Sequence, residues 1–125
     1  MSRSSLRSVR LLSALVVAGA TCVRTVAAHD LSAHWELHAD FDDRRIPGAL
    51  AGCTFKQEVE RVTGVCEDAT LVGEVKEETV TWRLTPAGTH DAMIFTGMLD
   101  DDDTVIVGRF SYAGKGDGSF LAVRR

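Results

Sequence analysis

The 125-residue sequence lacks a cluster of basic residues. It contains 14 Lys and Arg against 18 Asp and Glu, and four of the arginines lie within the first 28 residues. Residues 29–125 therefore carry ten basic and eighteen acidic side chains, a formal net charge of −8. Because an acidic surface repels phosphate groups, this composition excludes nucleic acid and anionic lipid headgroups as expected partners.

The sequence also lacks a catalytic signature. It has no nucleophile elbow, and neither Ser111 nor Ser119 has a histidine nearby in the sequence. His34 and His38 would lie about 13 Å apart along one strand, too far to share a metal ion. Residues 100–103 are four aspartates without the ligand spacing and glycine of a calcium loop, which favours a charged hairpin turn. We therefore predict no enzymatic activity, no metal and no cofactor.

No apolar run is long enough to span a bilayer, but residues 1–28 have the pattern of an export signal. Three arginines precede the apolar run 11–20, and small residues follow it. We expect cleavage after Ala28, with Ala20 as the alternative site. The prediction is a periplasmic or secreted domain of residues 29–125, without stable membrane association once the signal is removed.

Cysteine is scarce, and the two cysteines beyond the predicted signal are Cys53 and Cys66. If Val59 and Glu60 form a two-residue turn, these cysteines lie directly opposite each other across a hairpin. Opposed residues have Cβ atoms roughly 4.5–5.5 Å apart, which suits a disulfide. An exported protein meets an oxidising environment, so we predict that the pair is oxidised. Two buried thiols or a metal site are the alternatives, although no further ligands lie nearby in the sequence.

Helical periodicity is absent after residue 29, and short alternating segments take its place. Hairpin-length turns separate these segments, and no linker or second domain is visible. The pattern predicts an all-β fold, a single eight-stranded antiparallel up-and-down barrel. The expected strands are residues 31–41, 49–57, 61–67, 71–76, 79–85, 91–99, 104–112 and 119–124.

Glycine recurs in four of these segments, at Gly64, Gly73, Gly97 and Gly108. Because side chains alternate between the faces of a strand, each glycine shares a face with large apolar residues. We interpret this face as the barrel interior and the glycines as room for aromatic rings. The expected interior is therefore nearly full, with inward-pointing aromatic residues Trp35, Phe55, Trp82, Phe95, Phe110 and Phe120.

The first and last strands resemble those of the calycin barrels, a group that includes lipocalins, avidins and fatty-acid-binding proteins. The resemblance lies in Trp35 on the first strand and Arg124 at the end of the last. It implies that this tryptophan packs under this arginine and helps to close the barrel. The sequence 31–35 and the Thr-Gly pairs at 63–64 and 96–97 look like the avidin pattern, but no biotin-binding residues map onto this chain. The ending at residues 118–124 is similar to that of small exported bacterial β-barrel domains of unassigned function.

A second resemblance is to small periplasmic barrels that inhibit secreted metalloproteases, although their cysteine spacing is wider. From the crowded interior we predict a non-catalytic protein-interaction or accessory module with an unknown protein partner. The calycin resemblance implies an alternative, a carrier of a small apolar or amphipathic ligand at the barrel mouth. The residues that would face such a ligand are Phe55, Trp82, Phe95 and Phe110. A periplasmic protease inhibitor is the further alternative.

Overall fold

The computed structural model of the chain describes residues 29–125, and the predicted export signal lies outside them. Within this range the chain forms strands and turns, and no helix of membrane-spanning length and hydrophobicity occurs there. The strands are β2 (Ala33–Phe41), β3 (Ala49–Glu58), β4 (Arg61–Cys66), β5 (Ala69–Lys76), β6 (Thr79–Thr85), β7 (Met93–Leu99), β8 (Val105–Tyr112) and β9 (Gly116–Arg124).

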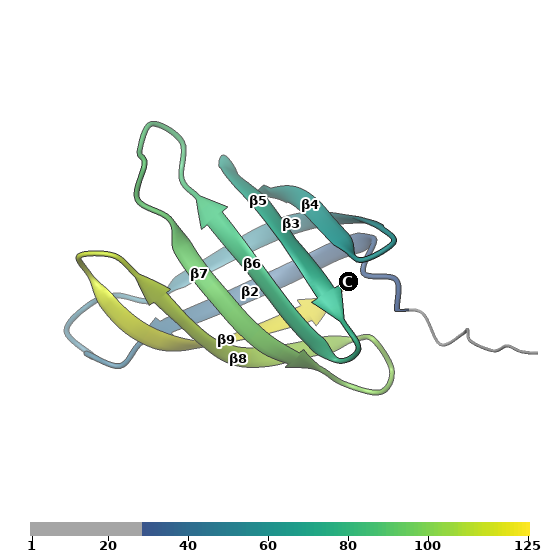
Figure 1. The fold of residues 1–125 in the computed structure, drawn as a ribbon. Helices are drawn as coiled ribbons and strands as arrows, with labels where there is room; N and C mark the ends of the chain where they lie inside the picture. The colour runs from purple at the N-terminus through teal and green to yellow at the C-terminus, as the bar shows by residue number, and fades with distance from the viewer. Residues whose placement is uncertain (1–28) are drawn as a thin grey trace, which may run out of the picture.

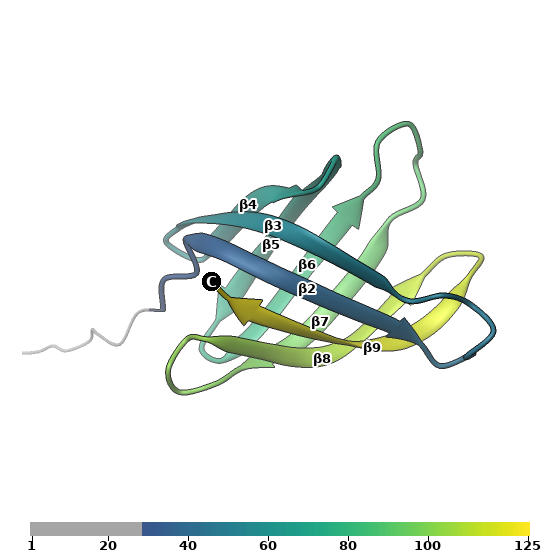
Figure 2. The ribbon, with the colours of Figure 1, turned by 180° about the vertical axis from the view of Figure 1, so that it is seen from behind.

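The eight strands form one closed antiparallel barrel in chain order (Figure 1). Each strand pairs with the next, and β9 returns to pair with β2, as the view from behind in Figure 2 shows. The predicted eight-stranded up-and-down barrel is therefore confirmed. Closure matters because it removes the free sheet edges that would otherwise pair with other chains.

The two ends of the barrel are built differently. One end, here called the closed end, holds residues 29–32, the chain terminus after β9, and the turns β3–β4, β5–β6 and β7–β8. The other end, here called the loop end, holds the longer connections 42–48 and 86–92 with the turns β4–β5 and β8–β9. The antiparallel meander produces this division, since alternate connections fall at opposite ends.

Alternation of side chains along each strand produces the core. Trp35, Leu37 and Ala39 of β2 are buried, while the residues between them face outward. The same alternation holds on β6, where Val80, Trp82 and Leu84 point inward. The remaining buried apolar residues of the strands are Cys53, Phe55, Val62, Cys66, Ala69, Leu71, Val75, Phe95, Leu99, Ile106, Phe110, Phe120 and Ala122.

The cysteine hairpin has the predicted register. Cys53 lies opposite Cys66, with a Cα–Cα distance of 4.0 Å, and the two residues form a disulfide. The turn between their strands is Val59-Glu60, as the sequence predicts. Closing a loop of this length stabilises the fold by about 3 kcal/mol in the chain-entropy model.

Several inward glycines lie directly opposite aromatic residues. Gly64 faces Phe55 and Gly73 faces Trp82 across neighbouring strands. A Cβ on Gly73 would lie 2.1 Å from the Thr81 carbonyl oxygen and 2.5 Å from Cβ of Trp82. The glycines therefore let adjacent strands and their rings approach more closely than any other residue would allow.

Several strand boundaries differ from the expectation by one to three residues, with β5 beginning at Ala69 instead of residue 71 and β7 at Met93 instead of residue 91. The first and last strands show the physical reasons. The last strand begins at Gly116 instead of residue 119, because Gly118 pairs with Phe110 and extends the ladder. The first strand begins at Ala33 instead of residue 31, because the segment before it turns across the closed end. Leu31 in that segment is fully buried, and this could not be read from strand alternation alone.

Candidate functional site

The closed end is sealed by residues 29–32, which are fastened to two strands. The Leu31 amide donates to Oε1 of Gln57 (2.8 Å), and the Leu31 carbonyl accepts from Nε1 of Trp35 (2.9 Å). Nε2 of Gln57 also donates to the carbonyl of His29 (2.8 Å). One glutamine side chain thus satisfies backbone groups that strand pairing does not reach.

Arg124 completes this seal from the last strand. It lies opposite Trp35 in the β2–β9 register, and its guanidinium carbon is 5.7 Å from the centroid of that ring. Its Nη1 donates to the carbonyls of Asp30 (2.8 Å) and Asp103 (3.2 Å). The two residues that the resemblance assigns to closure are therefore in contact, in a cation–π arrangement worth about 1 kcal/mol.

The four residues expected to face a ligand form a continuous series of packed rings in the interior, here called the aromatic stack. Phe55 meets Trp82 edge to face, and the other two pairs are stacked. Ring centroids lie 5.5 Å apart for Phe55 and Trp82, 5.1 Å for Trp82 and Phe95, and 5.3 Å for Phe95 and Phe110. Phe120 packs edge-on against both Trp82 and Phe95. These are van der Waals contacts, so no ligand fits between the rings. Nε1 of Trp82 is buried here and has no hydrogen-bond partner among residues 29–125.

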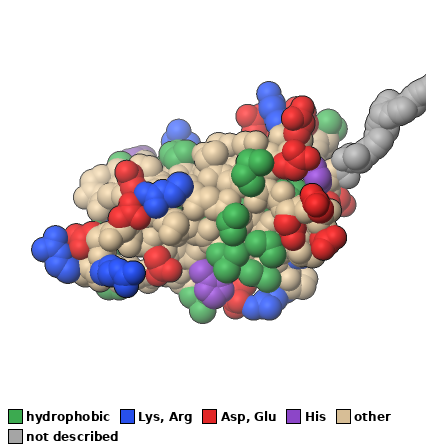
Figure 3. Space-filling model, turned by 90° about the horizontal axis from the view of Figure 1, so that it is seen from below, with side chains coloured by type: hydrophobic (Ala, Val, Ile, Leu, Met, Phe, Trp, Pro, Cys, Tyr) green, Lys and Arg blue, Asp and Glu red, His purple; other side chains and the backbone are tan. Residues whose placement is uncertain are grey.

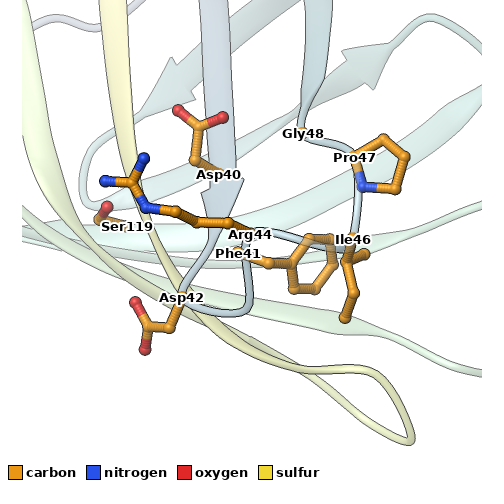
Figure 4. A pocket seen from close by; sticks show the side chains of 8 residues that line it. All are labelled: Asp40, Phe41, Asp42, Arg44, Ile46, Pro47, Gly48 and Ser119. Carbon is orange, nitrogen blue, oxygen red and sulfur yellow. The ribbon is translucent and has the colours of Figure 1, made fainter.

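A hollow of about 620 Å³ lies outside this stack, at the loop end (Figure 4). Its apolar wall comes from Phe41, Ile46 and Pro47, while Asp40 and Arg44 contribute charge. Phe41 packs edge-on against Phe110 with centroids 5.2 Å apart, so the hollow begins where the aromatic stack ends. This hollow could not be predicted from the sequence, because it depends on how connection 42–48 folds beside β2.

An ion pair anchors connection 42–48 to the barrel. Both terminal nitrogens of Arg109 donate to the carboxylate of Asp42, at 2.9 and 2.6 Å. This hydrogen bonding is the main reason that the pKa of Asp42 lies below its usual range. The Asp42 amide donates to the carbonyl of Asp117 (2.9 Å). The pair is exposed, so it positions the loop more than it stabilises the fold.

An apolar face covers the outer wall of three neighbouring strands (Figure 3). Strand register places Met98 beside Val107 and Val107 beside Leu121, and in the next row Val105 beside Val123. The first three are exposed by 53, 50 and 38 %. We call these five residues the apolar face. Their adjacency follows from the β7–β8–β9 register, whereas the sequence shows them only as scattered outward positions.

The candidate polar and metal-binding residues lie apart. His34 bonds to Thr54 on the outer wall, and His38 contacts Glu36. The carboxylate of Asp100 accepts the amides of Thr104 (2.8 Å) and Val105, and this lowers its pKa. The aspartate run is thus a capped turn. Within residues 29–125 no three His, Cys, Asp or Glu side chains group in a way that would hold a metal ion.

Ser111 and Ser119 both lie on the outer wall, and Ser119 is opposite Asp40 of β2. Ser111 lines a shallow outer groove with Thr96 and Arg109, and Ser119 borders the hollow at the loop end. Comparison of the chain with family models, with curated proteins and with solved structures found no match.

Proposed function

We propose that this protein is an exported, non-catalytic interaction module that binds a partner protein through the apolar face. The observation that supports this most directly is the contrast between the inside and the outside of the barrel. The interior is occupied by the protein's own packed aromatic rings. Met98, Val107 and Leu121 are instead left in contact with water on one continuous surface.

Contiguous exposed apolar residues favour association. Each Å² of apolar surface removed from water contributes about 25 cal/mol. A partner that covers these half-exposed side chains therefore gains a favourable contribution to its binding free energy. A closed barrel has no edge to offer a partner, which leaves its outer wall and its loops as binding surfaces. On this wall the strands hold the face rigid, so little conformational entropy is lost on binding.

The test compares two sets of outward substitutions. The variant M98Q/V107T/L121Q makes the apolar face polar, and V65T/V72T makes the same kind of change elsewhere on the wall. Each protein is purified from its native compartment and co-purifying proteins are quantified by mass spectrometry. A stoichiometric partner kept by the wild type and V65T/V72T but lost from the triple variant supports the proposal. A partner retained equally by all three overturns the assignment to this face.

Export is part of the proposal, and the Cys53–Cys66 disulfide supports it because such bonds persist in oxidising compartments. Amino-terminal sequencing of the protein from the periplasm or medium tests it. Cleavage after Ala28 gives a chain beginning at His29, and cleavage after Ala20 gives one beginning at Thr21. An intact amino terminus in the cytoplasm contradicts export.

A carrier of a small amphipathic ligand is a second candidate, favoured by the hollow at the loop end. Its volume of about 620 Å³ is in the range of small-molecule sites. Phe41 and Ile46 would contact the apolar part of a ligand, and Arg44 would contact a polar group. Native mass spectrometry distinguishes the two functions, since a bound small molecule lost in I46S supports the carrier. Its absence from the wild type argues for the interaction module.

A further inference from the structure

The surroundings of the apolar face indicate the chemistry of its partner, an inference that rests on the proposed function. At the closed-end border, the β7–β8 turn carries four consecutive aspartates directly between Met98 and Val105. The β5–β6 turn lies beside it, because the Leu99 amide donates to the carbonyl of Glu78 (2.8 Å). Figure 3 shows acidic side chains crowding this end of the face.

The two arginines that border the face are already occupied. Arg109 binds Asp42 through both terminal nitrogens, and Arg125 binds Glu36 beside Val123. These cations are therefore neutralised by carboxylates of the same molecule. They offer little attraction to an acidic partner.

The carboxylates at the border are mostly free. Within residues 29–125, Asp101, Asp102, Glu77 and Glu78 form no ion pair. Lys76 at the end of β5 contributes one positive charge nearby. The uncompensated charge beside the apolar face is thus negative, and the net charge of −8 on residues 29–125 has the same sign. A second copy of this chain would bring like charges together, so it fits poorly.

We propose that the apolar face binds a cationic amphipathic segment of another protein. Its apolar side chains would cover Met98, Val107 and Leu121, and its Lys or Arg side chains would reach Asp101 and Asp102. The apolar contact buries most of the interface area. The carboxylates favour a positively charged partner over a negatively charged one and increase its association rate at low salt.

The test uses protein purified after expression of the full chain and two synthetic fluorescein-labelled helical peptides. One is built of leucine and lysine, the other of leucine and glutamate in the same pattern. Fluorescence anisotropy should show binding of the lysine peptide only, weakened by raising the salt to about 0.15 M and beyond. M98Q/V107T/L121Q should weaken it by about tenfold, whereas V65T/V72T should not. D101N/D102N should weaken it several-fold and flatten the salt dependence.

Other outcomes separate this inference from the proposed function. Equal binding of the lysine peptide to the triple variant, or binding of the glutamate peptide, overturns the cationic partner. A third outcome is that neither peptide binds and the wild type forms a dimer in sedimentation equilibrium. If the triple variant abolishes that dimer, a second copy of the chain is the occupant, which overturns the cationic partner but keeps the face as an interface. A native partner that needs the face but is itself acidic also overturns this inference and leaves the proposed function standing. Unchanged unfolding midpoints of the variants show that the substitutions leave the fold intact.

Discussion

The closed end and the loop end of this barrel cover the openings of the barrel with different contacts. At the closed end, buried Leu31 fills the opening. The Gln57 side chain accepts from the Leu31 amide and donates to the His29 carbonyl, and Arg124 donates to the Asp30 carbonyl. At the loop end, connection 42–48 is held by the exposed pair Arg109–Asp42 and leaves a hollow beside Phe41. We therefore expect the closed end to contribute more to the free energy of unfolding than the loop end.

The largest expected effect contrasts one aromatic residue at each end. Trp35→Ala removes a buried ring, its bond to Leu31 and its contact with Arg124, and should lower the free energy of unfolding by about 4 kcal/mol. Phe41→Ala removes a half-buried ring at the hollow and should cost no more than about 2 kcal/mol. Urea unfolding of both variants measures the difference. Equal losses of unfolding free energy would show that the two ends contribute equally to stability.

The two arginines give the next contrast. Arg124→Ala leaves the carbonyls of Asp30, Ser32 and Asp103 without their donor and should lower the free energy of unfolding by about 2 kcal/mol. Arg109→Ala breaks only the exposed pair with Asp42 and should have a smaller effect. Hydrogen exchange of the Leu31 amide should accelerate in the first variant alone. Acceleration in both would mean that the ends are coupled.

A smaller effect concerns backbone conformation in the turns. Val59 has φ of 59° and is almost fully exposed, a strained arrangement for a β-branched residue. Val59→Gly relieves this strain and should raise the free energy of unfolding by about 1 kcal/mol. Gly88 at the loop end has φ of 78° and open space around it, so Gly88→Val should lower the midpoint instead. Thermal unfolding checks both signs.

The smallest expected effect is on the pKa values of two aspartates, Asp42 at the loop end and Asp100 at the closed end. The pKa of Asp42 is lowered chiefly by the bond from Arg109, and that of Asp100 chiefly by the Thr104 amide. Both contributions to stability are therefore present above the ordinary aspartate pKa of about 3.9 and are lost as pH falls through the lowered values. Arg109→Gln should return the pKa of Asp42 to its ordinary range and leave Asp100 low. NMR of the carboxyl carbons follows both, and parallel shifts would contradict these separate causes.

Much of the fold was predictable because its determinants are local. The turn at Val59-Glu60 sets the pairing of Cys53 with Cys66, and alternation assigns Trp82 and Phe95 to the interior. The candidate binding surfaces were not predictable in the same way. Met98, Val107 and Leu121 are far apart in the chain and become neighbours only through the register of three strands.

By itself, the sequence determined the strands, the disulfide pair and the set of inward residues. These features depend on the alternation of side chains along each strand and on short turns, both of which involve residues close together in the chain. Only the tertiary structure decided that residues 29–32 seal one end, since Gln57 and Arg124 reach them from strands distant in the chain. It also decided that exposed apolar residues meet beside an acidic turn. Such contacts depend on barrel closure and on the register between strands, and no single segment of the chain contains that information.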